Sequence, residues 1–470
     1  MTLAPARPVE AAPAVPGAWR RLAVRCAVAP AAVLLPLATL APDTGFDVYW
    51  HGSTVRNNSW TLITENLRTI PLYLEHGTFA PLGRIVDWSL DVAAYLLVEV
   101  LRLPTEIALR LIATLTAIVL TGVVVVFAEA VTARGRMFAA PPGRTLALLP
   151  FAVAGCLVAV NPQRLLSTAL VLGVAAWLCR GPRRAAAVIA VGAALAAYDE
   201  VAILGPVVAT VVLAARAWFV CGLDGPATLR RLGPAGLLWL GFLPLYVPIR
   251  LVLGDRSFLV YQYVLTVWTP PMQWHNAMTV AARPSMLVLL IAVVAFALLA
   301  WRTVGELGRL PNLDRRQAAG LTAAGAVVLL LGATCRSGLT AAGGVTLLVG
   351  LLAVRNSIPL HRWAMVGLAL TAAGSAVVNQ AYAGAVNREE YSLIQTAISR
   401  EIAQFDASDA GDARRCALRD RFAELTRGSG YGPLESQELP GTYSPVARLD
   451  VSLDMATVQM YGQTYCRRSL

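Results

Sequence analysis

Two adjacent carboxylates, Asp199 and Glu200, interrupt an otherwise apolar stretch of sequence, residues 196–206. A lipid bilayer solvates ionised side chains poorly, so acids that border apolar segments are candidate functional groups. A carboxylate in such a place could take a proton from a hydroxyl group as a general base. The alternative is that the pair forms a solvated turn between two membrane-spanning helices.

A long polar region, residues 42–106, contains a second group of candidates. Asp47 lies in an aromatic-rich stretch and could act as a base, or it could be an ordinary loop acid. Arg84 could bind a phosphate through its planar guanidinium, or it could extend along a membrane interface to reach water. His76 could act as a base or metal ligand beside Glu75, or simply lie exposed.

A third group lies in residues 254–283, where charge alternates with aromatic rings. Such residues could stack against a sugar, or they could form the aromatic belt of a membrane interface. The candidates for substrate binding here are Arg256, Tyr261, Tyr263 and Trp274.

Composition indicates how these groups must be positioned. The chain has 470 residues, of which 57% are hydrophobic and only 14% charged. These values exclude a disordered chain and make an all-α polytopic membrane protein the expected fold class. The net charge of +11 comes with 39 basic residues, all of them Arg. They do not alternate with aromatic residues along one face, so we expect no nucleic acid partner.

A span of about 20 apolar residues, the length that crosses a bilayer, predicts about eleven transmembrane helices. The expected ranges are 23–41, 107–131, 145–160, 165–179, 185–198, 201–219, 235–253, 285–301, 318–334, 339–354 and 363–383.

The arginines predict the orientation of these helices, because basic residues in short loops remain on the cytoplasmic side. One side of the membrane would carry nineteen arginines, whereas the short loops on the opposite side hold only a few. The nineteen are Arg7, Arg20, Arg21, Arg25, Arg134, Arg136, Arg144, Arg180, Arg183, Arg184, Arg216, Arg230, Arg231, Arg302, Arg309, Arg315, Arg316, Arg355 and Arg362. We therefore expect a multi-pass protein of the plasma or inner membrane, with a cytoplasmic N-terminus and an extracytoplasmic C-terminus.

This topology divides the chain into a cytoplasmic arm (1–22), a transmembrane domain (23–383) and an extracytoplasmic tail (384–470). The first external loop, 42–106, contains an amphipathic stretch near 84–102 that we expect to lie flat in the membrane interface. In the tail, Cys416 and Cys466 could form a disulfide bond that closes about 50 residues. The sequence alone does not decide between a disulfide bond and two free thiols.

Two segments resemble elements of the multispan glycosyltransferases of the GT-C class. Residues Tyr198–Pro206 resemble an acid-containing turn of that family, with Asp199 where the pattern often has Lys. Residues Gly77–Arg84 resemble a Gly/Arg/Pro-Leu element of its first external loop. At the level of architecture the similarity extends over most of residues 20–385, although both motifs are short.

This resemblance implies transfer of a sugar from a polyprenyl-phosphate donor to an extracytoplasmic glycan, lipid or protein, with inversion. The catalytic groups would be Asp47, Glu200 and Asp199. The chain departs from the family at Asn57 and Asn58, which stand where acids often occur and cannot act as a base. Either Asp47 or Asp43 supplies the carboxylate, or the protein has lost the chemistry and only binds a lipid-linked sugar.

The membrane lipid, the donor and the acceptor are the expected partners. The sequence identifies no certain cofactor, and its four His lack metal-binding spacing. A divalent cation bound by carboxylates remains possible. The alternative function is a transporter or flippase for a lipid-linked saccharide, which should show internal repeats and ionisable groups near the bilayer centre.

Overall fold

The structure is a computed structural model of the full chain. The segments that it describes, besides isolated positions elsewhere, are residues 60–75, 79–103, 105–132, 162–181, 183–199, 201–253, 315–333, 404–428 and 461–467. Within these segments the chain is mostly helical and contains no strand.

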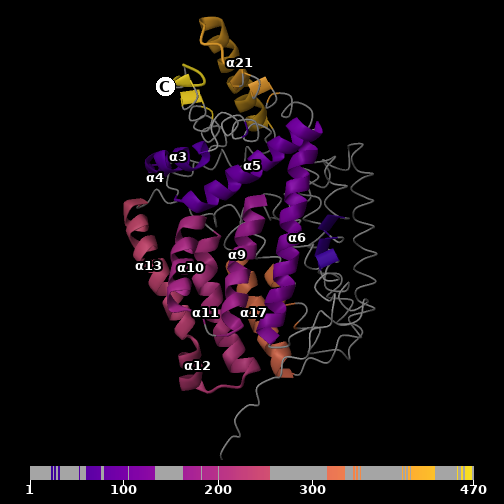
Figure 1. The fold of residues 1–470 in the computed structure, drawn as a ribbon, viewed down its shortest axis with the longest axis vertical. Coiled ribbons are helices and arrows are strands. Elements are labelled where there is room, and N and C mark those ends of the chain that lie inside the picture. The colour runs from indigo at the N-terminus through magenta and orange to yellow at the C-terminus, as the bar shows by residue number, and fades with distance from the viewer. Residues whose placement is uncertain are drawn as a thin grey trace, which may run out of the picture.

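A bundle of roughly parallel and antiparallel helices forms the body of the molecule (Figure 1). The bundle helices are α6 (Thr105–Thr132), α9 (Pro162–Cys179), α10 (Ala185–Tyr198), α11 (Gly205–Ala215), α13 (Gly233–Leu253) and α17 (Arg315–Ala333). Their buried side chains form one apolar core, which includes Phe127, Leu172, Leu195, Val212 and Phe242.

Close helix packing depends on small residues in α10 and α13. A side chain at Gly192 would overlap the Leu238 carbonyl oxygen, and one at Gly241 would overlap the Ile189 carbonyl oxygen. The two backbones therefore approach each other more closely than larger residues would allow. This use of glycine is typical of helix pairs in membranes, where van der Waals contact between helices drives association.

Three helices in the described part of the chain are long and apolar enough to cross a bilayer. They are Ile107–Thr132, Ala202–Val220, which includes the 3-10 turn η1 (Ala202–Leu204) and the π-helical turn η2 (Arg216–Val220), and Gly233–Val252. The apolar helices Leu165–Cys179, Ala185–Tyr198 and Arg316–Gly332 are shorter. These findings support the membrane character that the composition predicts.

Six of the expected ranges coincide with these helices, and 185–198 matches α10 at both ends. The other five expected ranges, 23–41, 145–160, 285–301, 339–354 and 363–383, lie outside the described segments, apart from isolated positions. The total of eleven therefore stays a prediction.

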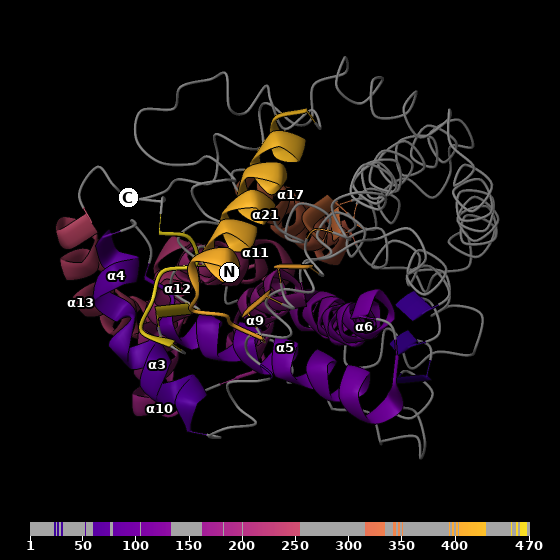
Figure 2. The same cartoon turned by 90° about the horizontal axis from the view of Figure 1, so that it is seen from above.

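One end of the bundle is covered by helices that run in a different direction. Helix α5 (Pro81–Leu101) lies across this end, with α3 (Thr61–Arg68) and α4 (Ile70–Glu75) beside it (Figures 1 and 2). Helix α5 packs on the start of α6 through Tyr95, Ala108 and Ile112. The stretch 84–102 is thus helical and lies across one end of the bundle, and its position in a membrane interface stays a prediction.

The tail helix α21 (Asp409–Gly428) lies beyond α5, on the same side of the bundle (Figure 1). The short helix α12 (Gly225–Arg231) lies at the opposite end of the bundle (Figure 1). The two ends of the bundle therefore differ in what covers them.

Candidate functional site

Asp199 lies at the end of the bundle that α5 covers, directly after the last residue of α10. Its side chain is 8% exposed. One carboxylate oxygen, Oδ1, accepts a hydrogen bond from the Ala202 backbone N–H at 2.7 Å. The other, Oδ2, accepts from Gln163 Nε2 at 2.9 Å and from the Ser167 hydroxyl.

These hydrogen bonds give Asp199 a clear structural role. It accepts a hydrogen bond from the buried Ala202 backbone N–H at the start of η1, as a helix-capping residue does. It also ties the turn between α10 and α11 to the first turns of α9, where Gln163 and Ser167 lie four residues apart on one face. These hydrogen bonds offset the cost of burying the carboxyl group.

The first turn of α5 packs directly on this turn. A side chain at Gly83 would overlap the Tyr198 carbonyl oxygen and come within 3.1 Å of Gln163 Nε2. Glycine is thus required here because the two backbones meet. The contact brings residues 83–84 and 198–199, which belong to the two family-like segments, to the same place in the fold.

Arg84 follows this contact and is 8% exposed, which is unusual for an arginine. Its backbone N–H donates to the Ala80 carbonyl at 2.9 Å and so begins α5. Asn66 of α3 donates from its side chain to the Pro81 carbonyl at 2.7 Å and fixes the same turn. One turn further along α5, Asp87 lies near enough to Tyr198 to interact electrostatically with its phenol group.

The site therefore combines two buried charged residues, Arg84 and Asp199, with the amino-terminal ends of α5, α9 and η1. Helix amino termini carry partial positive charge, as does the guanidinium. A guanidinium binds carboxylate and phosphate groups through paired hydrogen bonds, so phosphate is an anion that suits Arg84 chemically.

Of the residues proposed from the sequence, the structure describes Asp199 and Arg84 and brings their segments together. The others lie outside the described residues, namely Asp47, Glu200, His76, Arg256, Tyr261, Tyr263 and Trp274, as do Asn57 and Asn58. Sequence reasoning missed Gln163 and Ser167. Their signal was two polar residues four positions apart at the start of an apolar helix.

Arginines occupy the opposite end of the bundle, and two of them complete a helix there. Arg183 donates from Nε and Nη2 to the Trp177 carbonyl oxygen, each at 3.2 Å. Arg216, in the π-helical turn η2, donates to the Cys179 carbonyl oxygen. Cations at a helix carboxyl terminus stabilise the unpaired carbonyls and the helix dipole. These arginines therefore stabilise a helix end, in addition to the role in membrane orientation that the sequence predicts for them.

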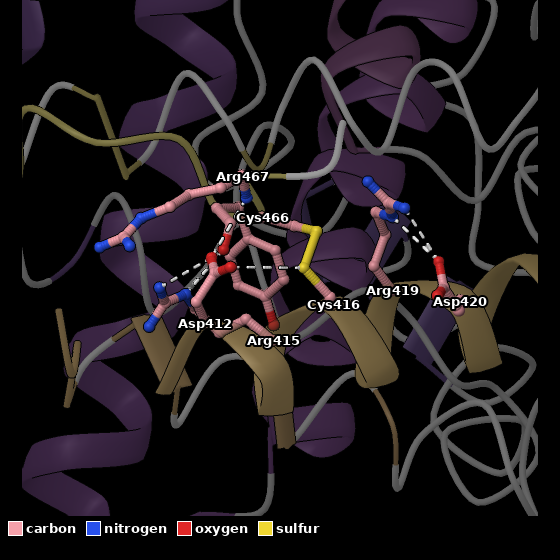
Figure 3. The surroundings of a disulfide bond; sticks show 8 residues. Asp412, Arg415, Cys416, Arg419, Asp420, Cys466 and Arg467 are labelled. Carbon is pink, nitrogen blue, oxygen red and sulfur yellow. Dashed lines mark hydrogen bonds and ion pairs between the residues drawn. A yellow bond between two sulfur atoms is a disulfide. The ribbon is translucent and has the colours of Figure 1, made fainter. Parts of the chain in front are cut away.

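The extracytoplasmic tail expected from the sequence is cross-linked. Cys416 and Cys466 form a disulfide bond with their Cα atoms 5.1 Å apart (Figure 3). The bond joins α21 to a segment 50 residues further along the chain. Of the remaining cysteines that are described, Cys26 and Cys179 are buried and Cys221 is exposed.

Arg415, next to this disulfide, is fully buried. Its Nε donates to the Tyr465 carbonyl at 2.6 Å and its Nη1 to the Asp406 carbonyl at 2.5 Å. Its Nη2 lies 3.4 Å from Asp412 Oδ1 (Figure 3). The guanidinium also lies 4.0 Å above the Phe405 ring, in a cation–π contact.

Further contacts hold the same part of the tail. Phe405 stacks on Tyr461 with the ring centroids 4.5 Å apart, and the Tyr461 hydroxyl donates to the Ile402 carbonyl. Burial raises the pKa of the Tyr465 phenol well above its usual range. Arg467 pairs with Asp409 at 3.0 Å. All of these contacts serve packing, and none resembles a catalytic arrangement.

Among the described residues, no group of three or more His, Cys, Asp or Glu side chains could hold a metal ion.

No family model, no curated protein and no solved structure matches the chain.

Proposed function

We propose that the protein is a membrane glycosyltransferase that moves a sugar from a polyprenyl-phosphate donor to an extracytoplasmic acceptor. The site would be the end of the bundle where α5 meets the turn after α10. The observation that carries this proposal is the close approach of Gly83 to the Tyr198 carbonyl, next to the buried residues Arg84 and Asp199. Two segments that resemble one family, and lie more than a hundred residues apart, adjoin at one place and contribute a buried guanidinium to it.

Two further observations support an extracytoplasmic position for this site. The arginines of η2, of α12 and of the loop that follows α9 gather at the other end of the bundle, as cytoplasmic loops would. The disulfide-bonded tail lies on the same side as α5 (Figure 1). Disulfides persist in oxidising compartments and are rare in the cytosol. Both features favour the same orientation.

In this proposal Arg84 binds the phosphate of the lipid-linked donor. A phosphate leaving group gains negative charge as the bond from the anomeric carbon to the phosphate oxygen breaks. A guanidinium held in a water-poor environment stabilises that charge more effectively than it would in bulk water. The rigid first turn of α5, anchored by Asn66 and by the Gly83 contact, would hold the guanidinium in position.

The acceptor hydroxyl would attack the anomeric carbon from the face opposite the phosphate, which inverts the configuration. Its proton would pass to a carboxylate, and we assign this role to Asp47, with Glu200 as the second catalytic carboxylate. The hydrogen bonds of Asp199 fit a positioning residue that orients the turn carrying Glu200. His76, Arg256, Tyr261, Tyr263 and Trp274 are the residues proposed to bind the sugar.

A glycan profile of a strain that lacks the gene, compared with its parent, tests the proposal. Loss of one sugar from an envelope glycan, lipid or protein would support it. Accumulation of a lipid-linked precursor on the cytoplasmic side would instead indicate a flippase. An unchanged profile would contradict both activities.

Complementation with single variants then tests the assigned residues. Asp47→Asn and Glu200→Gln should each fail to restore the missing sugar while inserting into the membrane normally. Asp224→Asn is the matched control, because Asp224 caps α12 at the opposite end of the bundle and Asn caps helices equally well. Full activity of both test variants would remove these carboxylates from the site.

A further inference from the structure

Helix α3 has its polar face directed inward and its apolar face directed outward. Asn66 and Thr69 are buried against the rest of the protein. Trp60, Ile63 and Leu67 are exposed by 67%, 41% and 58%. The spacing of these three residues places them on a single face of the helix. This is the reverse of the pattern in a helix on a water-exposed surface, where the apolar side faces the core.

Part of the polar face forms hydrogen bonds within the protein. The Asn66 amide donates to the Pro81 carbonyl of α5 at 2.7 Å, and the Thr69 hydroxyl donates to the Glu65 carbonyl at 2.7 Å. The first of these bonds joins α3 to α5. The exposed side chains of Trp60, Ile63 and Leu67 contribute little to the attachment of this helix and face another environment.

The exposed face of α3 lies near the apolar surface of α13, a candidate membrane span. Helix α4, which follows α3 directly, contacts α13. Helix α13 is a candidate membrane span, and it exposes Val247, Leu251 and Val252 in its last turns. These last turns lie at the end of the bundle that α3 and α4 cover (Figure 1). The apolar surface of α13 thus continues toward α3.

We propose that α3 is an anchor in the lipid bilayer, with Trp60, Ile63 and Leu67 inserted into the membrane interface beside α13. Trp is the residue most enriched at such interfaces, because its ring is apolar and its N–H is polar. Arg68, exposed in the last turn of α3 and 3.7 Å from Glu65, extends toward the lipid phosphates. The partner of this surface is the lipid itself, and the inference does not depend on the proposed activity.

Spin labels on the full-length protein in phosphatidylethanolamine and phosphatidylglycerol vesicles test this inference. The labels replace Ile63 and Leu67 through Ile63→Cys and Leu67→Cys, in a background where the cysteines outside the disulfide are alanine. Molecular oxygen concentrates in the bilayer and a nickel chelate stays in water, so the ratio of their effects on label relaxation reports the environment.

Two reference positions calibrate the measurement. Leu251→Cys on α13 represents lipid, and Arg421→Cys on α21 represents water, since both side chains are exposed. We expect oxygen-to-nickel ratios at 63 and 67 that match position 251 and exceed position 421 several-fold. Because all four sites are exposed, the labels need no rearrangement of the core.

Three results would overturn the inference. Ratios equal to that at position 421 would put α3 in water. Protection from both reagents would mean that protein covers the face, either a second copy of the chain or another partner. Lipid-like behaviour at only one of the two labels would exclude a common inserted face.

Discussion

Asp199 and Arg415 are both buried charges, but the protein accommodates them by different means. Asp199 lies at the end of a helix bundle whose apolar core is extensive, and its partners are the side chains of Gln163 and Ser167 and one backbone N–H. Arg415 lies in a small tail and binds backbone carbonyls from residues that lie far apart in sequence. A disulfide bond adjoins it.

The difference follows from how much apolar surface each region can bury. A bundle of long helices is held by packing, so a buried acid there has only to satisfy its own hydrogen bonds. A small region cannot build a sufficient core and depends on cross-links and polar networks. We therefore expect the tail to lose its structure when one residue changes, and the bundle end to change only locally.

The largest effect should come from Arg415→Ala. The substitution leaves the Tyr465 and Asp406 carbonyls and the Asp412 carboxylate without the guanidinium, and removes its contact with Phe405. Loss of a buried charged partner costs about 3–5 kcal/mol, and we expect the upper end of this range. Hydrogen exchange of the α21 amides should become much faster, while α10 should not change.

Arg421→Ala is the control for this variant. Arg421 is exposed and pairs with the exposed Glu424. Such surface pairs contribute about 0–1 kcal/mol. If the two variants exchange at equal rates, the network around Arg415 does not hold the tail.

Removal of the disulfide by Cys416→Ser with Cys466→Ser should have the next largest effect. In the loop-entropy account, closing a loop of 50 residues stabilises the folded tail by roughly 4 kcal/mol. The same hydrogen-exchange measurement should show faster exchange confined to α21 and residues 461–467. Exchange that stays at the parent rate would mean that packing alone holds this region.

Much of the helical organisation is readable from the sequence, because apolar length predicts spanning helices well. The range 185–198 matches α10 because Arg184 and Asp199 border an uninterrupted apolar segment. The expected start of α9 was three residues late, since Pro162 and Gln163 begin the helix before its apolar run. Local sequence thus locates most helices, but their ends depend on capping contacts.

The environments of the two buried charges were harder to predict. Asp199 is conspicuous in the sequence, yet its partners lie 36 and 32 positions away on another helix. Arg415 is one of several arginines in a polar helix, where Arg414, Arg419 and Arg421 have the same local setting. Only the tertiary position of residues 461–467 distinguishes Arg415 from them.

Asp199→Ala should have a moderate effect at the bundle end. It removes the acceptor of the Gln163 amide, the Ser167 hydroxyl and the Ala202 N–H, and hydrogen bonds to charged groups contribute about 1.5–3 kcal/mol. The midpoint of thermal unfolding in detergent should fall. Asp199→Asn should recover part of the loss, because its oxygen can still cap η1.

Local exchange distinguishes this expectation from a general loss of structure. Amides of η1 and the first turn of α11 should exchange faster in Asp199→Ala, while those of α21 keep the parent rate. Equal acceleration in both regions would contradict the independence of the two buried charges.

The smallest effect concerns Asp406, an exposed carboxylate at the edge of the Arg415 network. Its pKa is lowered by hydrogen bonds from the Ser408 backbone and side chain and from Arg414. A lowered folded-state pKa stabilises the tail fully above the unfolded value of about 3.9, and this contribution is lost as the pH falls through the folded pKa. In the parent protein, exchange of the α21 amides, corrected for intrinsic rates, should therefore accelerate as the pH falls below about 4.

Asp406→Asn should reduce that acceleration slightly, because Asn cannot titrate. Superimposable pH profiles for the two proteins would mean that Asp406 contributes nothing to the tail, and that Arg415 and the disulfide hold it without help from the surface.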